Sequence, residues 1–112
     1  MQNKKSEYFP ISTLRETFRQ SAEEKATRLR RSVSRLTSCD MQPCLEYGEE
    51  VKTEYALVQQ ILYLQNCRDA LEKTIDAGAA KLRYRWADGM VSMTRFRKIG
   101  PNRVKVTGLV QC

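Results

Sequence analysis

The chain of 112 residues contains no histidine. Histidine is the most common general acid or base near neutral pH and the most common metal ligand. The chain also lacks a glycine-rich phosphate loop of the G-x-x-x-x-G-K-S/T or the G-x-G-x-x-G kind. A cysteine nucleophile would have no histidine to activate it. We therefore expect a protein that is not an enzyme and that uses no cofactor.

Cysteine is present, but not in a metal-binding pattern. The four cysteines lie at positions 39, 44, 67 and 112, and none belongs to a C-x-x-C pair. Without such a pair or a histidine, a zinc site is not expected. Cys39 and Cys44 could form a local disulfide, although so small a loop would add little stability. Reduced, structural thiols are the favoured interpretation.

Long apolar runs are absent as well. No stretch approaches the roughly 18 apolar residues that a membrane span requires. The first five residues are polar and basic with no apolar segment behind them, so no secretory signal is predicted. We expect a single domain covering residues 1–112, located inside the cell in the cytoplasm or nucleus, with no membrane partner.

The first third of the chain has the pattern of an amphipathic helix, because apolar residues recur there every three or four positions. Thr13 and Glu16 form a T-x-x-E capping box, which marks a helix start. The pattern predicts a polar lead-in at residues 1–11 and a helix at residues 12–37. The short break around Pro43 predicts that the next helix lies antiparallel to the first.

A second, longer helix is predicted at residues 44–87, which contain no proline. Apolar residues recur there with the heptad spacing of a coiled-coil seam. At 1.5 Å per residue the helix would be roughly 60 Å long, too long for this chain to bury, so a partner helix is expected. The predicted oligomer interface consists of Leu57, Ile61, Leu64, Arg68, Leu71, Ile75 and Leu82.

A charged residue in this seam has two explanations. Arg68 could select the register or the partner, since a charge at a core position lowers stability. It could equally extend past the edge of an ordinary homodimer seam and select nothing. The partner could therefore be a second copy of the chain or a different coiled-coil protein.

The C-terminal part has strand character. Gly89 is a plausible end of the long helix, and β-branched residues alternate on both sides of Gly100-Pro101-Asn102, which favours a turn. We predict a small β-hairpin at residues 90–110. The predicted fold class is therefore mainly α, an antiparallel, coiled-coil-like helical hairpin with a long second helix and a small C-terminal β-hairpin.

The formal net charge of +7 is unevenly distributed. Residues 1–36 carry a net +5, residues 37–80 a net −5 and residues 81–112 a net +7. The arginines at the end of the first helix would lie beside glutamates at the start of the second. Pairing within the chain is therefore favoured for them over a nucleic-acid surface. The last third has no such compensation, since Asp88 is its only acidic residue.

The basic residues of the last third are the candidate nucleic-acid-binding residues: Lys81, Arg83, Arg85, Arg95, Arg97, Lys98, Arg103 and Lys105. Long cationic side chains on a preformed platform suit phosphate binding, and Tyr84, Trp86 and Phe96 are interleaved for stacking. The alternative is that solvated charges protect a hairpin edge from aggregation and that Trp86 and Phe96 attach the hairpin to the helix.

Two functional hypotheses follow from these patterns. The favoured one is a non-enzymatic, sequence-independent nucleic-acid-binding protein. Its basic C-terminal region would be held on an oligomeric helical scaffold, with RNA preferred to DNA because A-form duplexes are recognised largely by backbone and shape. The alternative is a coiled-coil adaptor or assembly subunit whose long helix pairs with another protein.

Overall fold

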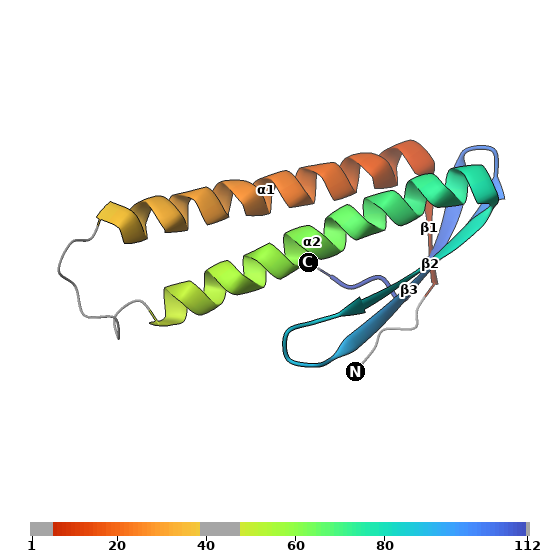
Figure 1. Cartoon of the computed structure of the whole chain (residues 1–112). Coiled ribbons are helices and arrows are strands. Elements are labelled where there is room, and N and C mark those ends of the chain that lie inside the picture. Colours follow the sequence, from red (N-terminus) through yellow and green to blue (C-terminus); the bar gives the residue numbers. More distant parts are fainter. Residues whose placement is uncertain (1–5, 39–47, 112) are drawn as a thin grey trace.

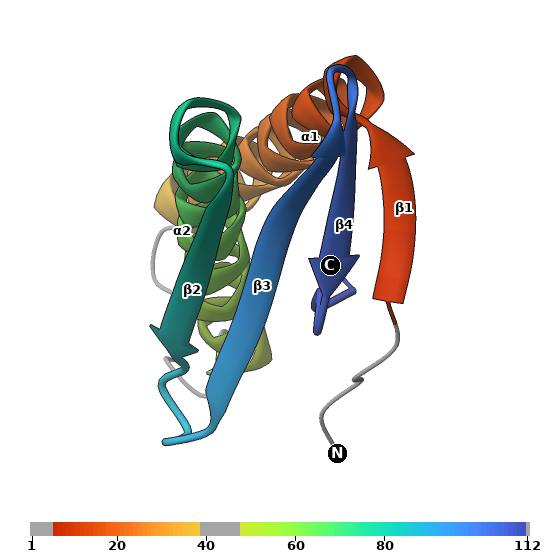
Figure 2. The ribbon, with the colours of Figure 1, turned by 90° about the vertical axis from the view of Figure 1, so that its right-hand side faces the viewer.

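The computed structural model describes residues 6–38 and 48–111 and contains two helices and one sheet. The elements follow in the order β1 (Ser6–Pro10), α1 (Ile11–Ser38), α2 (Gly48–Ala77), β2 (Ala79–Arg85), β3 (Val91–Gly100) and β4 (Arg103–Thr107). The strands form an antiparallel sheet in the order β1-β4-β3-β2. Figure 2 shows both helices behind the strands, so that they cover the same face of the sheet.

The predicted fold class, mainly α with a small hairpin, is wrong, because the protein is mixed α/β. The predicted hairpin at 90–110 corresponds to β3 and β4, but these two strands form the centre of a four-stranded sheet. The two helices lie side by side and extend past the sheet at one end (Figure 1). They are one layer of a two-layer fold and not a coiled coil, since their inner surfaces pack on the strands.

The N-terminal lead-in predicted at residues 1–11 contains a strand instead. Ser6–Pro10 forms β1 at the edge of the sheet and pairs with β4. The Ser6 and Thr107 hydroxyls lie 3.0 Å apart although 101 positions separate them in the chain. A strand of five residues whose partner is so distant leaves no periodic pattern in its own neighbourhood, and this explains the error.

Helix α1 begins close to the predicted position, but the expected capping box does not start it. The Ile11 amide donates a hydrogen bond of 2.8 Å to the Asn102 carbonyl in the β3–β4 turn. Thr13 lies within the helix, where its carbonyl accepts a bond of 2.9 Å from the Thr17 hydroxyl. Glu16 pairs with Arg19 on the helix surface. A distant turn therefore satisfies the first amide of α1.

The long helix predicted at 44–87 ends ten residues early, at Ala77. Gly78 adopts a φ of 90°, and its amide donates a bond of 2.8 Å to the Thr74 carbonyl, a common way for a helix to end. The chain then reverses into β2, where exposed and half-buried residues alternate. Gly89, the predicted end of the helix, lies instead in the β2–β3 turn.

The predicted oligomer seam lies largely inside the chain. Leu57, Leu64 and Leu71 are buried, with 4%, 5% and 0% of their surface exposed. Ile61 is half-buried, Ile75 and Leu82 pack partly buried against the core, and Arg68 is exposed. The helix is shorter than predicted, and α1 and the sheet cover it. Oligomerisation stays a prediction that this seam no longer supports.

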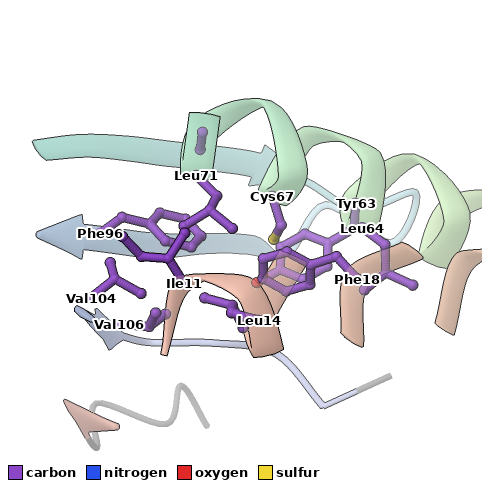
Figure 3. Packing of buried hydrophobic residues seen from close by; sticks show 11 residues of the cluster. Ile11, Leu14, Phe18, Tyr63, Leu64, Cys67, Leu71, Phe96, Val104 and Val106 are labelled. Carbon is purple, nitrogen blue, oxygen red and sulfur yellow. The ribbon is translucent and has the colours of Figure 1, made fainter. Parts of the chain in front are cut away.

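The core joins the start of α1, the second half of α2 and the two central strands (Figure 3). Its buried members are Ile11, Leu14, Phe18, Tyr63, Leu64, Cys67, Ala70, Leu71, Phe96, Val104 and Val106. Phe18 meets Phe96 edge-on, with ring centroids 6.3 Å apart, an arrangement that aromatic pairs favour. Neither described helix has an apolar stretch long enough to cross a lipid bilayer.

One buried polar network fixes the C-terminal segment to the core. The Tyr63 hydroxyl lies 2.6 Å from the Thr94 hydroxyl and accepts a bond of 3.1 Å from the Val110 amide. Thr94 donates in turn to the Gly108 carbonyl at 3.1 Å. Burial, followed by the nearby Cys67, raises the pKa of Tyr63 above its ordinary range. The phenol therefore remains a neutral hydrogen-bond donor to Thr94.

We expect Leu71→Ala to lower the free energy of unfolding by about 2–5 kcal/mol, because it leaves a cavity in the core. The matched control is Leu62→Ala on the same helix, where the side chain is 46% exposed, with an expected change within about 0.5 kcal/mol. Urea unfolding followed by circular dichroism measures both values. If both substitutions lowered the free energy of unfolding equally, this would contradict the burial of Leu71 between α2 and the rest of the core.

Candidate functional site

The pairing register collects most of the basic residues of the last third on the uncovered face of the sheet. Lys81 lies opposite Arg95, and Arg97 lies opposite Lys105. Side chains alternate between the two faces of a strand, so each partner pair shares one face. The residues between them, such as Phe96 and Val106, are buried against the helices. The cationic side chains therefore point away from α1 and α2.

We call this surface the basic face. Its members are Lys81, Arg83, Arg85, Arg95, Arg97, Arg103 and Lys105. All are exposed except Lys105, which is half-buried. They lie on three adjacent strands, β2, β3 and β4, on the side of the sheet turned toward the viewer in Figure 2.

Lys98 is the one predicted binding residue that does not join the basic face. It lies opposite Val104, which is fully buried, and it shares the helix side of β3 with Phe96. The register then shifts between Lys98 and Gly100. The Lys98 amide donates a bond of 2.8 Å to the Gly78 carbonyl. This bond continues the β2–β3 pairing by one position, to the residue that follows α2, whereas the register shift lies on the β4 side of β3.

Acidic residues are missing from the same face in the four strands. The only acidic strand residue, Glu7, lies opposite Val106 and therefore belongs to the helix side. The ion pairs among the described residues join Arg15 to Glu72 at 2.7 Å and Arg19 to Glu16 and Glu23, all on the helices. Within the described ranges, then, no carboxylate neutralises the basic face.

The directly opposed cations oppose sheet formation. Like charges facing each other across antiparallel strands destabilise the pair, and this occurs both at Lys81 with Arg95 and at Arg97 with Lys105. Replacing one member of each pair with an acid would relieve the repulsion without altering the core. Proteins break a local rule of this kind mainly at functional sites, so the opposed cations make this face a candidate for binding an anion.

The spacing of the basic face suits a repeating anion. Neighbouring strands lie about 4.8 Å apart and alternate residues along a strand about 6.7 Å apart, so the cations form a regular two-dimensional array on the sheet. Five of the seven members are arginines. The planar guanidinium donates two parallel hydrogen bonds to phosphate or carboxylate and remains charged at every physiological pH.

The aromatic residues predicted to stack on bases face the helices instead. Phe96 is 2% exposed. Tyr84 and Trp86 form a cluster with Tyr63, with ring centroids 4.8 to 5.5 Å apart. For Trp86 and Phe96, the alternative interpretation of packing between strands and helices matches their observed position, and Tyr84 shares this position. The aromatic residue of the uncovered face is Tyr8, 54% exposed and opposite Lys105; it was missed because β1 was missed.

Other candidate chemistry falls partly outside the described residues. Arg28 and Arg30 are exposed on α1. The arginines at the end of the first helix were predicted to pair with glutamates at the start of the second, and the side chains of these glutamates are not among those described. Cys39, Cys44 and Cys112 also lie outside the described ranges, whereas Cys67 is a buried thiol. Among the described side chains, no three Cys, Asp or Glu residues come together as a metal site requires.

Comparison of the chain with protein-family models, with curated proteins and with solved structures finds no match. A function can therefore be argued only from the chain's own geometry. The basic face is the feature of the described residues that points most directly to a ligand.

We expect Arg95→Glu to raise the free energy of unfolding on the order of 0.5 to 1 kcal/mol at low salt, because Lys81 would then face an opposite charge. Arg83→Glu is the control, since it changes the net charge equally but lies opposite Met93. Urea unfolding at low and high salt measures both, and the difference should shrink as salt screens the pair. Finding Arg95→Glu no more stable than Arg83→Glu would contradict the repulsion.

Proposed function

We propose that the protein binds nucleic acid without sequence preference by holding the phosphate backbone against the basic face. The observation that supports this function best is the strand register, which places seven cations and no acid on one side of the sheet. Neutralising several phosphates with arginine and lysine releases condensed counterions, and this release drives sequence-independent binding.

The other residues of the uncovered face fit contacts to the backbone rather than to bases. They include the Tyr8 hydroxyl and the hydrogen-bonded pair Ser6 and Thr107. Tyr8 and one hydroxyl of this pair can donate hydrogen bonds to phosphate or sugar oxygens. Asparagine and glutamine, the usual readers of adenine, do not occur in the four described strands. The proposed contacts position the nucleic acid and carry no sequence information.

The shape of the face favours RNA over DNA. The major groove of B-form DNA admits a helix or a two-stranded ribbon, which is narrower than a four-stranded sheet. RNA presents a wide, shallow minor groove and exposed single-stranded segments, and both are accessible to a broad sheet surface. The proposed function requires no oligomer, since a single chain supplies all seven cations.

The adaptor hypothesis receives less support. It depended on a free seam along the long helix, but Leu57, Leu64 and Leu71 are buried within the same chain. A partner helix would have to displace α1 or the sheet to reach them. Nucleic-acid binding, in contrast, uses a surface that the described residues leave uncovered.

We expect the double variant Arg95→Ala/Arg97→Ala to bind RNA on the order of tenfold more weakly at low salt. The slope of log affinity against log salt should also become shallower, by about 0.7 to 0.9 for each phosphate that the variant no longer neutralises. Fluorescence anisotropy with labelled RNA and with DNA of the same sequence, each at two salt concentrations, measures both quantities.

The control for this experiment removes the same charge from another surface. Arg28→Ala/Arg30→Ala changes two exposed arginines of α1 and should leave the salt slope nearly unchanged. Equal weakening in the two double variants would show that net charge matters and the basic face does not. Absence of binding by the native chain at micromolar concentration and low salt would refute the proposed function.

A further inference from the structure

A pocket of about 540 Å³ lies where α2 passes the β2–β3 turn; this turn is seen below α2 in Figure 1. Its lining residues are Tyr55, Ala56, Gln59 and Gln60 from the helix and Trp86, Ala87 and Asp88 from the turn. The volume falls within the usual range for small-molecule sites, about 300 to 1,000 Å³, and would hold one nucleoside. The nucleic-acid function proposed above does not use this pocket.

The turn is fixed against the helix, so the pocket is preformed. The Ala87 amide donates a bond of 3.0 Å to the side-chain oxygen of Gln59, and the Tyr84 hydroxyl donates one of 3.2 Å to the Gln59 carbonyl. The indole nitrogen of Trp86 donates to the Ser92 hydroxyl at 2.7 Å. The Trp86 ring also packs against Tyr63 and Tyr84, and the surface that these contacts leave lines the pocket.

The lining suits a flat, uncharged heterocycle better than a phosphate. Tyr55 and Trp86 provide aromatic surface, and base–aromatic stacking is a general source of affinity for unpaired bases. Gln60 provides an amide that can both donate and accept hydrogen bonds. The one charged lining residue is Asp88, whose carboxylate would repel a phosphate but can accept from the exocyclic amino group of a base.

The pocket continues directly from the basic face. Arg85 belongs to that face, and the next residue, Trp86, lines the pocket. Strand β2 forms the edge of the sheet, so no further strand separates its uncovered side from its helix side. Consecutive Cα atoms are about 3.8 Å apart. A nucleotide whose phosphate contacts Arg85 can therefore turn its base around the end of β2.

We propose that this pocket takes one unpaired nucleobase from a strand whose phosphates lie on the basic face. The inference depends on the proposed function and makes it more specific, because it assigns the protein to single-stranded segments, loops or overhangs. Bases that are paired in a duplex cannot leave the stack without a cost in unpairing and unstacking. Binding should therefore be stronger to single strands than to duplexes of the same charge.

The experiment uses the only tryptophan of the chain, Trp86, as a reporter inside the pocket. The full chain is titrated at low salt with a short oligoadenylate, with an abasic oligomer of the same number of phosphates, and with the oligoadenylate in duplex form. We expect the single strand to quench Trp86 fluorescence and to bind about tenfold more tightly than the abasic oligomer. The abasic oligomer and the duplex should bind with little quenching.

Two pocket variants and one control make the assignment specific. Tyr55→Ala should weaken oligoadenylate binding about tenfold, to the level of the abasic oligomer, whereas Tyr55→Phe should retain tight binding because it keeps the ring. Tyr55 is 60% exposed, so neither change removes core packing. Val58→Ala alters the next exposed large apolar side chain of α2, which does not line the pocket, and should have no effect.

The outcomes separate this inference from the function on which it depends. Equal binding of the oligoadenylate and the abasic oligomer, without quenching and without an effect of Tyr55→Ala, would overturn the base pocket and leave backbone binding intact. Equal quenching by the duplex would also overturn it. If neither oligomer binds at low salt, the proposed function and the base pocket both fail.

Discussion

Side-chain alternation along the sheet is the constraint on which the structure depends. On the helix side, Phe96, Val104 and Val106 complete the core. On the other side, the neighbours of these residues along the strands are cations, except for Thr107. A slip of one residue in the register would exchange the two sets, burying arginines and exposing the core. The same hydrophobic burial that stabilises the fold therefore also determines where the positive charge lies.

The first and last strands of the chain meet in this sheet. Strand β1 pairs with β4, and the first amide of α1 is bonded to the β3–β4 turn. These bonds set the position of α1 over the central strands, where Phe18 reaches Phe96. The core of the protein thus depends on pairings between residues that lie far apart in sequence, which form only after large loops have closed.

The sequence predicted local features well and long-range features poorly. Patterns among neighbouring residues indicate the first helix, the turn at Pro101-Asn102 and the basic character of the last third. The end of α2 was missed because Leu82 satisfies a helical heptad as well as the alternation of a strand. Strand β1 and the uncovered face were missed because they depend on pairing partners in another part of the chain. No sequence pattern predicts the pocket, because its lining comes from a helix and a turn that lie apart in the sequence.

The edge position of β2 gives its charges a second role. An edge strand exposes unpaired backbone groups that can join the strand of another molecule, and lysine or arginine on such a strand discourages this. Lys81, Arg83 and Arg85 lie along this edge. A bound polyanion would neutralise the very charges that keep two copies apart. If the protein binds a polyanion as proposed, its edge strand β2 would be least protected against pairing with another molecule when the polyanion is bound.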